Sequence, residues 1–123
     1  MLPKTISAQT VNTTTGSMGF GSVLITQDPN NPNLGIFFGF DENTSGLYYV
    51  GSITDKLNGN YTLTVVAFIP PNTHLVSGIT SPSVPTKEVF TVSLNSDEMT
   101  GAPFYLIGAG QNSSVQYTLS TTW

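Results

Sequence analysis

The strongest constraint on this chain is a regular alternation between short apolar or Thr-rich runs and clusters of turn-forming residues. The clusters include DPNNPN (28–33), DENTSG (41–46), DKLNGN (55–60) and SPSVPT (81–86). Their Asp, Asn, Gly and Pro residues supply positive φ, fix φ or cap their own backbone. No window of eleven residues has apolar residues at the 3.6-residue period of a helix. The pattern therefore predicts short strands joined by tight turns.

The runs between these clusters predict an all-β domain. We expect nine strands, at residues 5–11, 22–27, 34–40, 47–54, 61–69, 74–79, 87–95, 104–108 and 115–122. Short strands at this spacing are typical of an antiparallel β-sandwich or barrel, and we expect a sandwich of 8–9 strands. Asn58-Gly59 has the sequence of a type I′ hairpin turn. Residues 1–123 are expected to form a single domain, with residues 1–20 as a candidate N-terminal arm.

The stretch GIFFGFDENTSGLYY (35–49) carries two adjacent aromatic pairs, one on each side of an acidic turn. Neighbouring residues on a strand point to opposite faces, so Phe37-Phe38 and Tyr48-Tyr49 place aromatic rings on both faces. One core covers only one face. Either loop and terminal packing or another subunit must therefore cover the second face. We expect another subunit, and the predicted interface residues are Phe37, Phe38, Tyr48, Tyr49 and Trp123. DENTSG is expected to be a hairpin connection, with hydrogen bonds from Asp41 and Asn43 and a positive φ at Gly46.

The chain is unusually poor in charge. Charged residues make up 8% of the sequence, about a third of the usual fraction, whereas Thr, Ser and Asn together make up 41 of the 123 residues. The only cations are Lys4, Lys56 and Lys87, and the net charge is −4. Recognition of a phosphate backbone requires many more cations, so we expect no direct nucleic-acid binding. No segment approaches the ~20 apolar residues of a membrane span, so we expect no membrane insertion.

The side chains needed for catalysis are scarce. His74 is the only histidine and there is no cysteine, so neither a thiolate nucleophile nor a His/Cys zinc site is available. The acidic doublets Asp41-Glu42 and Asp97-Glu98 are sequence neighbours whose side chains point apart on extended chain, and we interpret them as surface turns. Asp28 and the asparagines that follow it lack the spacing of a calcium loop. We expect no enzymatic activity, no cofactor and no metal.

In strand count, loop spacing and length the chain resembles the single jelly-roll capsid proteins of icosahedral viruses. This resemblance favours a jelly roll over an immunoglobulin-like topology. It also implies a virion protein, a capsid, spike or decoration subunit, whose partners are copies of itself and other structural proteins. The lack of basic residues departs from family members that contact the genome with a basic arm.

An alternative interpretation is an immunoglobulin-like extracellular module at the cell surface. GNYTLTVVAF (59–68) and KEVFTVSL (87–94) would suit its strands, and the Thr- and Asn-rich surface would suit a filament or pilus subunit or a glycan-binding adhesin. Glycan contact would then use exposed tyrosines.

Overall fold

The computed structural model describes residues 2–12, 18–42, 46–74, 80–95, 100–101 and 113–119. These residues contain strands, bridges and turns but no helix. The strands are β1 (Thr5–Asn12), β2 (Met18–Asp28), β3 (Asn31–Asp41), β4 (Tyr48–Leu57), β5 (Asn60–Ile69), β6 (Thr86–Asn95), β7 (Thr100–Gly101) and β8 (Ser113–Leu119). The expected strands at 74–79 and 104–108 lie largely outside the described residues.

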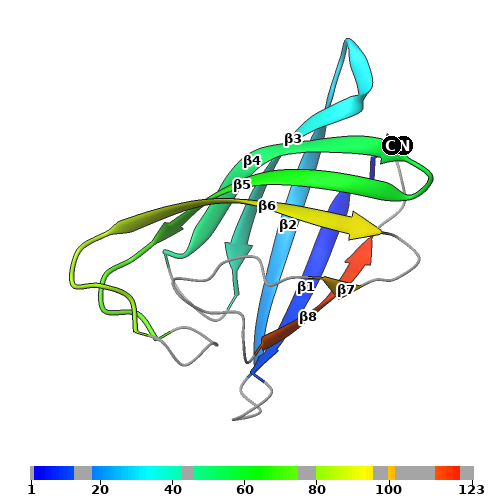
Figure 1. Cartoon of the computed structure of the whole chain (residues 1–123). Helices are drawn as coiled ribbons and strands as arrows, with labels where there is room; N and C mark the ends of the chain where they lie inside the picture. The colour runs from blue at the N-terminus through cyan, green and yellow to red at the C-terminus, as the bar shows by residue number, and fades with distance from the viewer. Residues whose placement is uncertain are drawn as a thin grey trace.

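All eight strands belong to one antiparallel sheet, in the order β6-β5-β4-β3-β2-β1-β8-β7. From β1 to β6 each strand pairs with the next one in the chain, and the sheet curls into a half-barrel (Figure 1). The prediction of an all-β antiparallel fold is confirmed. The predicted sandwich of 8–9 strands and the jelly-roll topology are not confirmed, because six consecutive strands pair in chain order within a single sheet.

The curl separates an inner face, which forms the core, from an outer face. On β5, Tyr61, Leu63, Val65, Ala67 and Ile69 are buried, while the residues between them are exposed or half-buried. The same period of two recurs on the other long strands, as alternate side chains of a pleated strand require. The core residues of the remaining strands are Ile6, Ala8, Val23, Ile25, Phe37, Tyr49, Ile53, Val92 and Leu94.

Two predicted hairpins have the expected backbone. Asn58 and Gly59 have φ of 57° and 78°, as both central residues of a type I′ turn require. Gly46 has φ of 84°, and the Asp41 amide donates a hydrogen bond to the Leu47 carbonyl at 3.0 Å, so the end of β3 lies beside the residue that precedes β4. The hydrogen bond expected from Asn43 lies outside the described residues.

The described part of the candidate N-terminal arm is built into the chain's own sheet. β1 lies between β2 and β8, and Leu2 is fully buried. The Lys4 carbonyl accepts a hydrogen bond from the Ile25 amide at 2.9 Å. An arm that reached a neighbouring subunit would have to give up these contacts.

Candidate interaction surface

The structure places the predicted interface aromatics on both faces of the sheet. Phe37 and Tyr49 are each 4% exposed and contribute to the core on the inner face. Phe38 and Tyr48 lie on the outer face and are 49% and 37% exposed. Trp123 lies outside the described residues. Of the predicted set, Phe38 and Tyr48 are thus the described residues that a second protein could contact.

Phe38 belongs to a row of apolar side chains that crosses five strands of the outer face. The strand register pairs Leu24 with Phe38, Phe38 with Val50, Val50 with Val66, and Val66 with Val89. Leu24, Phe38 and Val89 are exposed, and the two central valines are half-buried. We call these five residues the apolar row. Directly paired side chains on one face are close neighbours, so the row is continuous.

A second row, next to the first, is aromatic. Phe40 pairs with Tyr48, and Tyr48 pairs with Phe68. The Tyr48 ring stacks on Phe68 with centroids 4.8 Å apart, and on Phe38 of the apolar row with centroids 5.9 Å apart. We call Phe40, Tyr48 and Phe68 the aromatic row, and the two rows together the outer apolar band. Stacking holds the rings of Phe38, Tyr48 and Phe68 against one another before any partner binds.

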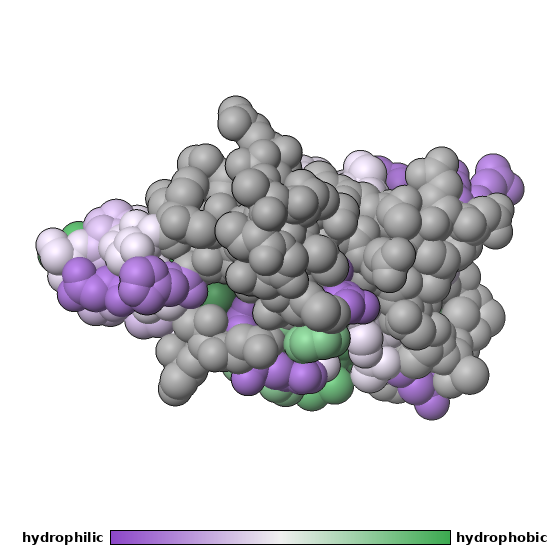
Figure 2. All heavy atoms as spheres, turned by 90° about the horizontal axis from the view of Figure 1, so that it is seen from below, coloured by the Kyte–Doolittle hydropathy of each residue, from purple (hydrophilic) through white to green (hydrophobic). Residues whose placement is uncertain are grey.

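Polar residues border the band. On one side, the next register row contains the hydroxyls of Thr26, Ser52, Thr64 and Thr91, interrupted by Ile36. On the other side lie two opposite charges: Lys87 pairs with Phe68 at the end of the aromatic row, and Glu42 follows β3. Ser22 donates a hydrogen bond to the Glu42 carboxylate at 2.8 Å. Figure 2 views the molecule from below, and the described residues visible on that side include both hydrophobic and hydrophilic ones.

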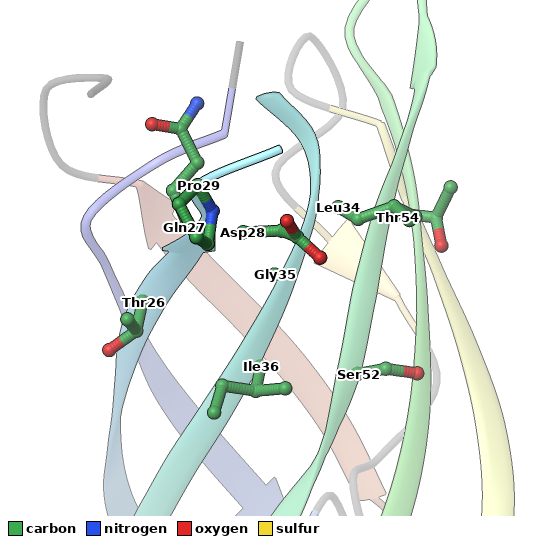
Figure 3. A pocket seen from close by; sticks show the side chains of 9 residues that line it. All are labelled: Thr26, Gln27, Asp28, Pro29, Leu34, Gly35, Ile36, Ser52 and Thr54. Carbon is green, nitrogen blue, oxygen red and sulfur yellow. The ribbon is translucent and has the colours of Figure 1, made fainter. Parts of the chain in front are cut away.

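Two adjoining hollows lie on the outer face, where small side chains stand beside large ones. The first, of about 510 Å³, is lined by Thr26, Gln27, Asp28, Pro29, Leu34, Gly35, Ile36, Ser52 and Thr54. In Figure 3 the Asp28 carboxylate lies between the side chains from β2 and those from β4. The second, of about 570 Å³, shares Thr26 and Ile36 with the first and extends to Leu24, Phe38 and Val50 of the apolar row.

Two acidic side chains, Asp41 and Asp55, are buried. Asp55 pairs across strands with Tyr61, and its carboxylate accepts a hydrogen bond from the Leu57 amide at 2.7 Å. Burial raises the pKa of Asp55, but the hydrogen bonds that its carboxylate accepts outweigh this and leave the pKa below its ordinary value. Burial and the charge of Asp55 both raise the pKa of Tyr61. This pair supports the fold at the β4–β5 hairpin.

The residues examined for catalysis are dispersed. His74 is exposed, and its Nδ1 lies 2.9 Å from the Thr80 hydroxyl. Asp41 is buried and Glu42 is exposed, so the two side chains point apart as expected for neighbours on extended chain, but the expected surface position is wrong for Asp41. Asp97 and Glu98 lie outside the described residues. Within the part of the chain that the structure describes, no three His, Asp or Glu side chains form a group suited to a metal ion.

The side-chain oxygens near Asp28 that were considered as calcium ligands accept hydrogen bonds within the β2–β3 turn. The Asp28 carboxylate accepts a hydrogen bond from the Asn30 amide at 2.7 Å, and the Asn31 side chain accepts one from the Asn33 amide at 3.0 Å. Such bonds mimic a backbone turn. As for membrane spans, none of the described residues forms a helix of the length and hydropathy that a crossing would need.

Sequence reasoning identified two members of the outer apolar band as interface residues and did not identify the other six. Leu24, Phe40, Val50, Val66, Phe68 and Val89 are spread over five strands, and most of them lie beside other apolar residues. They become a band only through the register of those strands, which alternation within a strand does not report.

Fold and surface together define this chain as a helix-free curled antiparallel sheet, over its described residues, with a core on one face and an apolar band on the other. Comparisons with models of protein families, with curated proteins and with solved structures found no match to it.

Proposed function

We propose that this protein is a non-catalytic structural subunit that self-associates through the outer apolar band, in a capsid or as a spike or decoration subunit at a virion surface. The observation that carries the proposal is the apolar row, which crosses five strands without a charged side chain. The central parts of protein interfaces are depleted in charge and enriched in aromatic residues, and the band has both properties.

The area of the band supports this proposal. Phe38, Phe40, Tyr48, Leu24 and Val89 are between 37% and 64% exposed. With about 200 Å² for a fully exposed aromatic side chain and somewhat less for an aliphatic one, they present on the order of 500 Å² of apolar surface. The largest apolar patch on a typical monomer has about this size and is often functional, so the band is a candidate site of interaction. The virion setting is the one implied by the sequence resemblance, and the proposal requires no jelly-roll topology.

Multi-angle light scattering over a wide concentration range, combined with negative-stain electron microscopy, tests this function. We expect the mass to rise with concentration and the images to contain closed rings or shells. Filaments would favour the alternative of a pilus-like or filament subunit. A constant monomer mass at every concentration would contradict self-assembly itself.

A second candidate function is glycan contact by an adhesin module, which the hollow beside the β2–β3 hairpin favours. Its apolar side chains, Leu34 and Ile36, lie next to the Asp28 carboxylate and the hydroxyls of Ser52 and Thr54. Sugars offer both apolar faces and hydroxyl groups to such a surface. A glycan array tests it: specific signals that Asp28→Ala removes would support the adhesin, and an array at background would contradict it.

A further inference from the structure

We propose that the partner on the outer apolar band is a second copy of this chain. The two copies are related by a two-fold axis that lies in the interface between them and runs parallel to β4. This inference rests on the proposed self-association and adds its geometry. Such an axis makes β3 of one copy face β5 of the other, and β2 face β6, while each register row faces itself.

The residues of the band complement themselves under this operation. Phe38 faces the partner's Val66, Phe40 faces the partner's Phe68, and Val50 and Tyr48 each lie close to the axis. Leu24 faces the partner's Val89 at the margin. Every apolar side chain of the band thus meets another apolar side chain. In the neighbouring row Thr26 faces the partner's Thr91, and Ile36 faces the partner's Thr64.

Charge complementarity supports the same axis. Lys87 lies at the β6 end of the aromatic row, and Ser22 lies at the β2 end of the same register row. The operation therefore brings Lys87 opposite the partner's Ser22, whose hydroxyl is hydrogen-bonded to Glu42. The Lys87 ammonium of each copy comes beside the Glu42 carboxylate of the other, twice in each dimer. Opposite charges at the rim of an interface fix its register.

A two-fold axis perpendicular to the strands is less favourable. An axis along the apolar row would place the aromatic row against the hydroxyl row, with Tyr48 opposite Ser52 and Phe68 opposite Thr64. It would also place Lys87 opposite Thr91 rather than near an acid. Burying hydroxyl groups against aromatic rings removes their hydrogen bonds to water without replacing them, which costs free energy.

The curl of the sheet sets the size of the contact. An outwardly curved face touches its copy mainly along β3, β4 and β5, so Leu24, Val89 and the charged pairs form the margin (Figure 1). The area available is smaller than the ~800 Å² per partner of a standard interface. We therefore expect a dimer that dissociates on dilution, and that is reinforced by other contacts in a larger assembly.

A charge-swap cycle tests the axis. Within one chain, Lys87 on β6 and Glu42 at the end of β3 are three strands apart, roughly 14 Å at ~4.8 Å per strand, so they do not pair within the chain. Lys87→Glu and Glu42→Lys should each weaken dimerisation about tenfold, since each places like charges together at both symmetric contacts. The double variant Lys87→Glu/Glu42→Lys should restore it, with thermal melting curves confirming that all variants fold.

Cross-linking provides an independent readout. The chain has no cysteine, so a single introduced one reports one position. Packed sheets lie ~10 Å apart, so a bis-maleimide of about that reach should join Val50→Cys to its copy near the axis. Thr91→Cys lies on β6 and faces β2 of the partner, so the reagent should not cross-link it to the same position of the partner. If the wild type associates but the double swap fails to restore dimerisation, the axis is wrong while self-association stands. The same conclusion follows if Thr91→Cys cross-links as efficiently as Val50→Cys. A monomeric wild type would overturn both proposals.

Discussion

The ring of Phe37 occupies the space that a side chain at Gly51 would need. The two residues are register partners on β3 and β4. A Cβ atom added at Gly51 would lie 2.9 Å from Phe37 Cζ and 3.0 Å from Phe37 Cε1, and closer still to the Thr64 carbonyl oxygen. The glycine is thus what allows an aromatic ring to lie flat against the inner face of the sheet.

Gly51→Ala should destabilise the fold strongly. The new methyl group meets backbone on one side and a buried ring on the other, so we expect a loss of about 3 kcal/mol in the free energy of unfolding. Denaturant titration monitored by far-ultraviolet circular dichroism measures this loss of stability. Ser52→Ala, the neighbouring substitution on the outer face, is the matched control and should change stability by less than about 0.5 kcal/mol. Equal effects of the two substitutions would contradict the packing described for Phe37.

Tyr48 and Tyr49 form a second matched pair, since they are sequence neighbours on opposite faces. Tyr49→Ala removes a core side chain and should cost about 3–5 kcal/mol of stability. Tyr48→Ala removes a ring stacked on the outer face and should cost about 1 kcal/mol, while it weakens self-association. Thermal unfolding together with sedimentation velocity separates these effects. If Tyr49→Ala reduces association at unchanged stability, the assignment of the two faces is wrong.

The Asp55 carboxylate should make stability depend on acid pH. Its pKa is lowered in the fold, so the ionised form stabilises the protein above the ordinary pKa near 4, and this contribution is lost as pH falls through the lowered value. Asp55→Asn should therefore be less stable than wild type at neutral pH, with a difference that shrinks below about pH 4. Urea unfolding midpoints across this range measure the difference. A gap that stays constant with pH would show that the charge of Asp55 contributes nothing.

Leu57 has a φ of 72°, in the left-handed region that non-glycine residues enter at a cost of about 1 kcal/mol or more. Its side chain is 59% exposed, so little packing offsets this cost. Leu57→Gly should raise the free energy of unfolding by up to about 1 kcal/mol, although the greater backbone entropy of glycine removes part of the gain. A chemical unfolding curve shows the change. Valine tolerates positive φ worse than leucine, so Leu57→Val should lower the free energy of unfolding.

Part of this architecture could be predicted from the sequence, because turn chemistry and alternation are local. The Asn58-Gly59 turn, the positive φ of Gly46 and the strand character of the long β segments all follow from residues next to one another. The number of sheets and the pairing order did not follow, because hairpins in chain order and Greek-key pairings use the same strands and turns.

The face that each β3 residue occupies shows the same limit. On β3, Ile36, Phe38 and Phe40 alternate with Gly35, Phe37 and Gly39, a pattern that by itself would place the face with three large residues in the core. The structure buries Gly35, Phe37 and Gly39 instead. Large inward side chains on the neighbouring strands, such as Val23 and Tyr49, fill the space over Gly39. Burial of a strand face is therefore decided by its neighbours, which one sequence does not place.

The most direct test of the account compares wild type with Val50→Thr/Val66→Thr in sedimentation velocity at several concentrations. These substitutions keep the shape and strand propensity of the two central residues of the apolar row while adding hydroxyl groups to its surface. Thr64→Val on the neighbouring hydroxyl row is the control. We predict that wild type and the control associate as concentration rises, whereas the double variant stays a folded monomer. Association of the double variant at wild-type strength would show that the outer apolar band is not the interface.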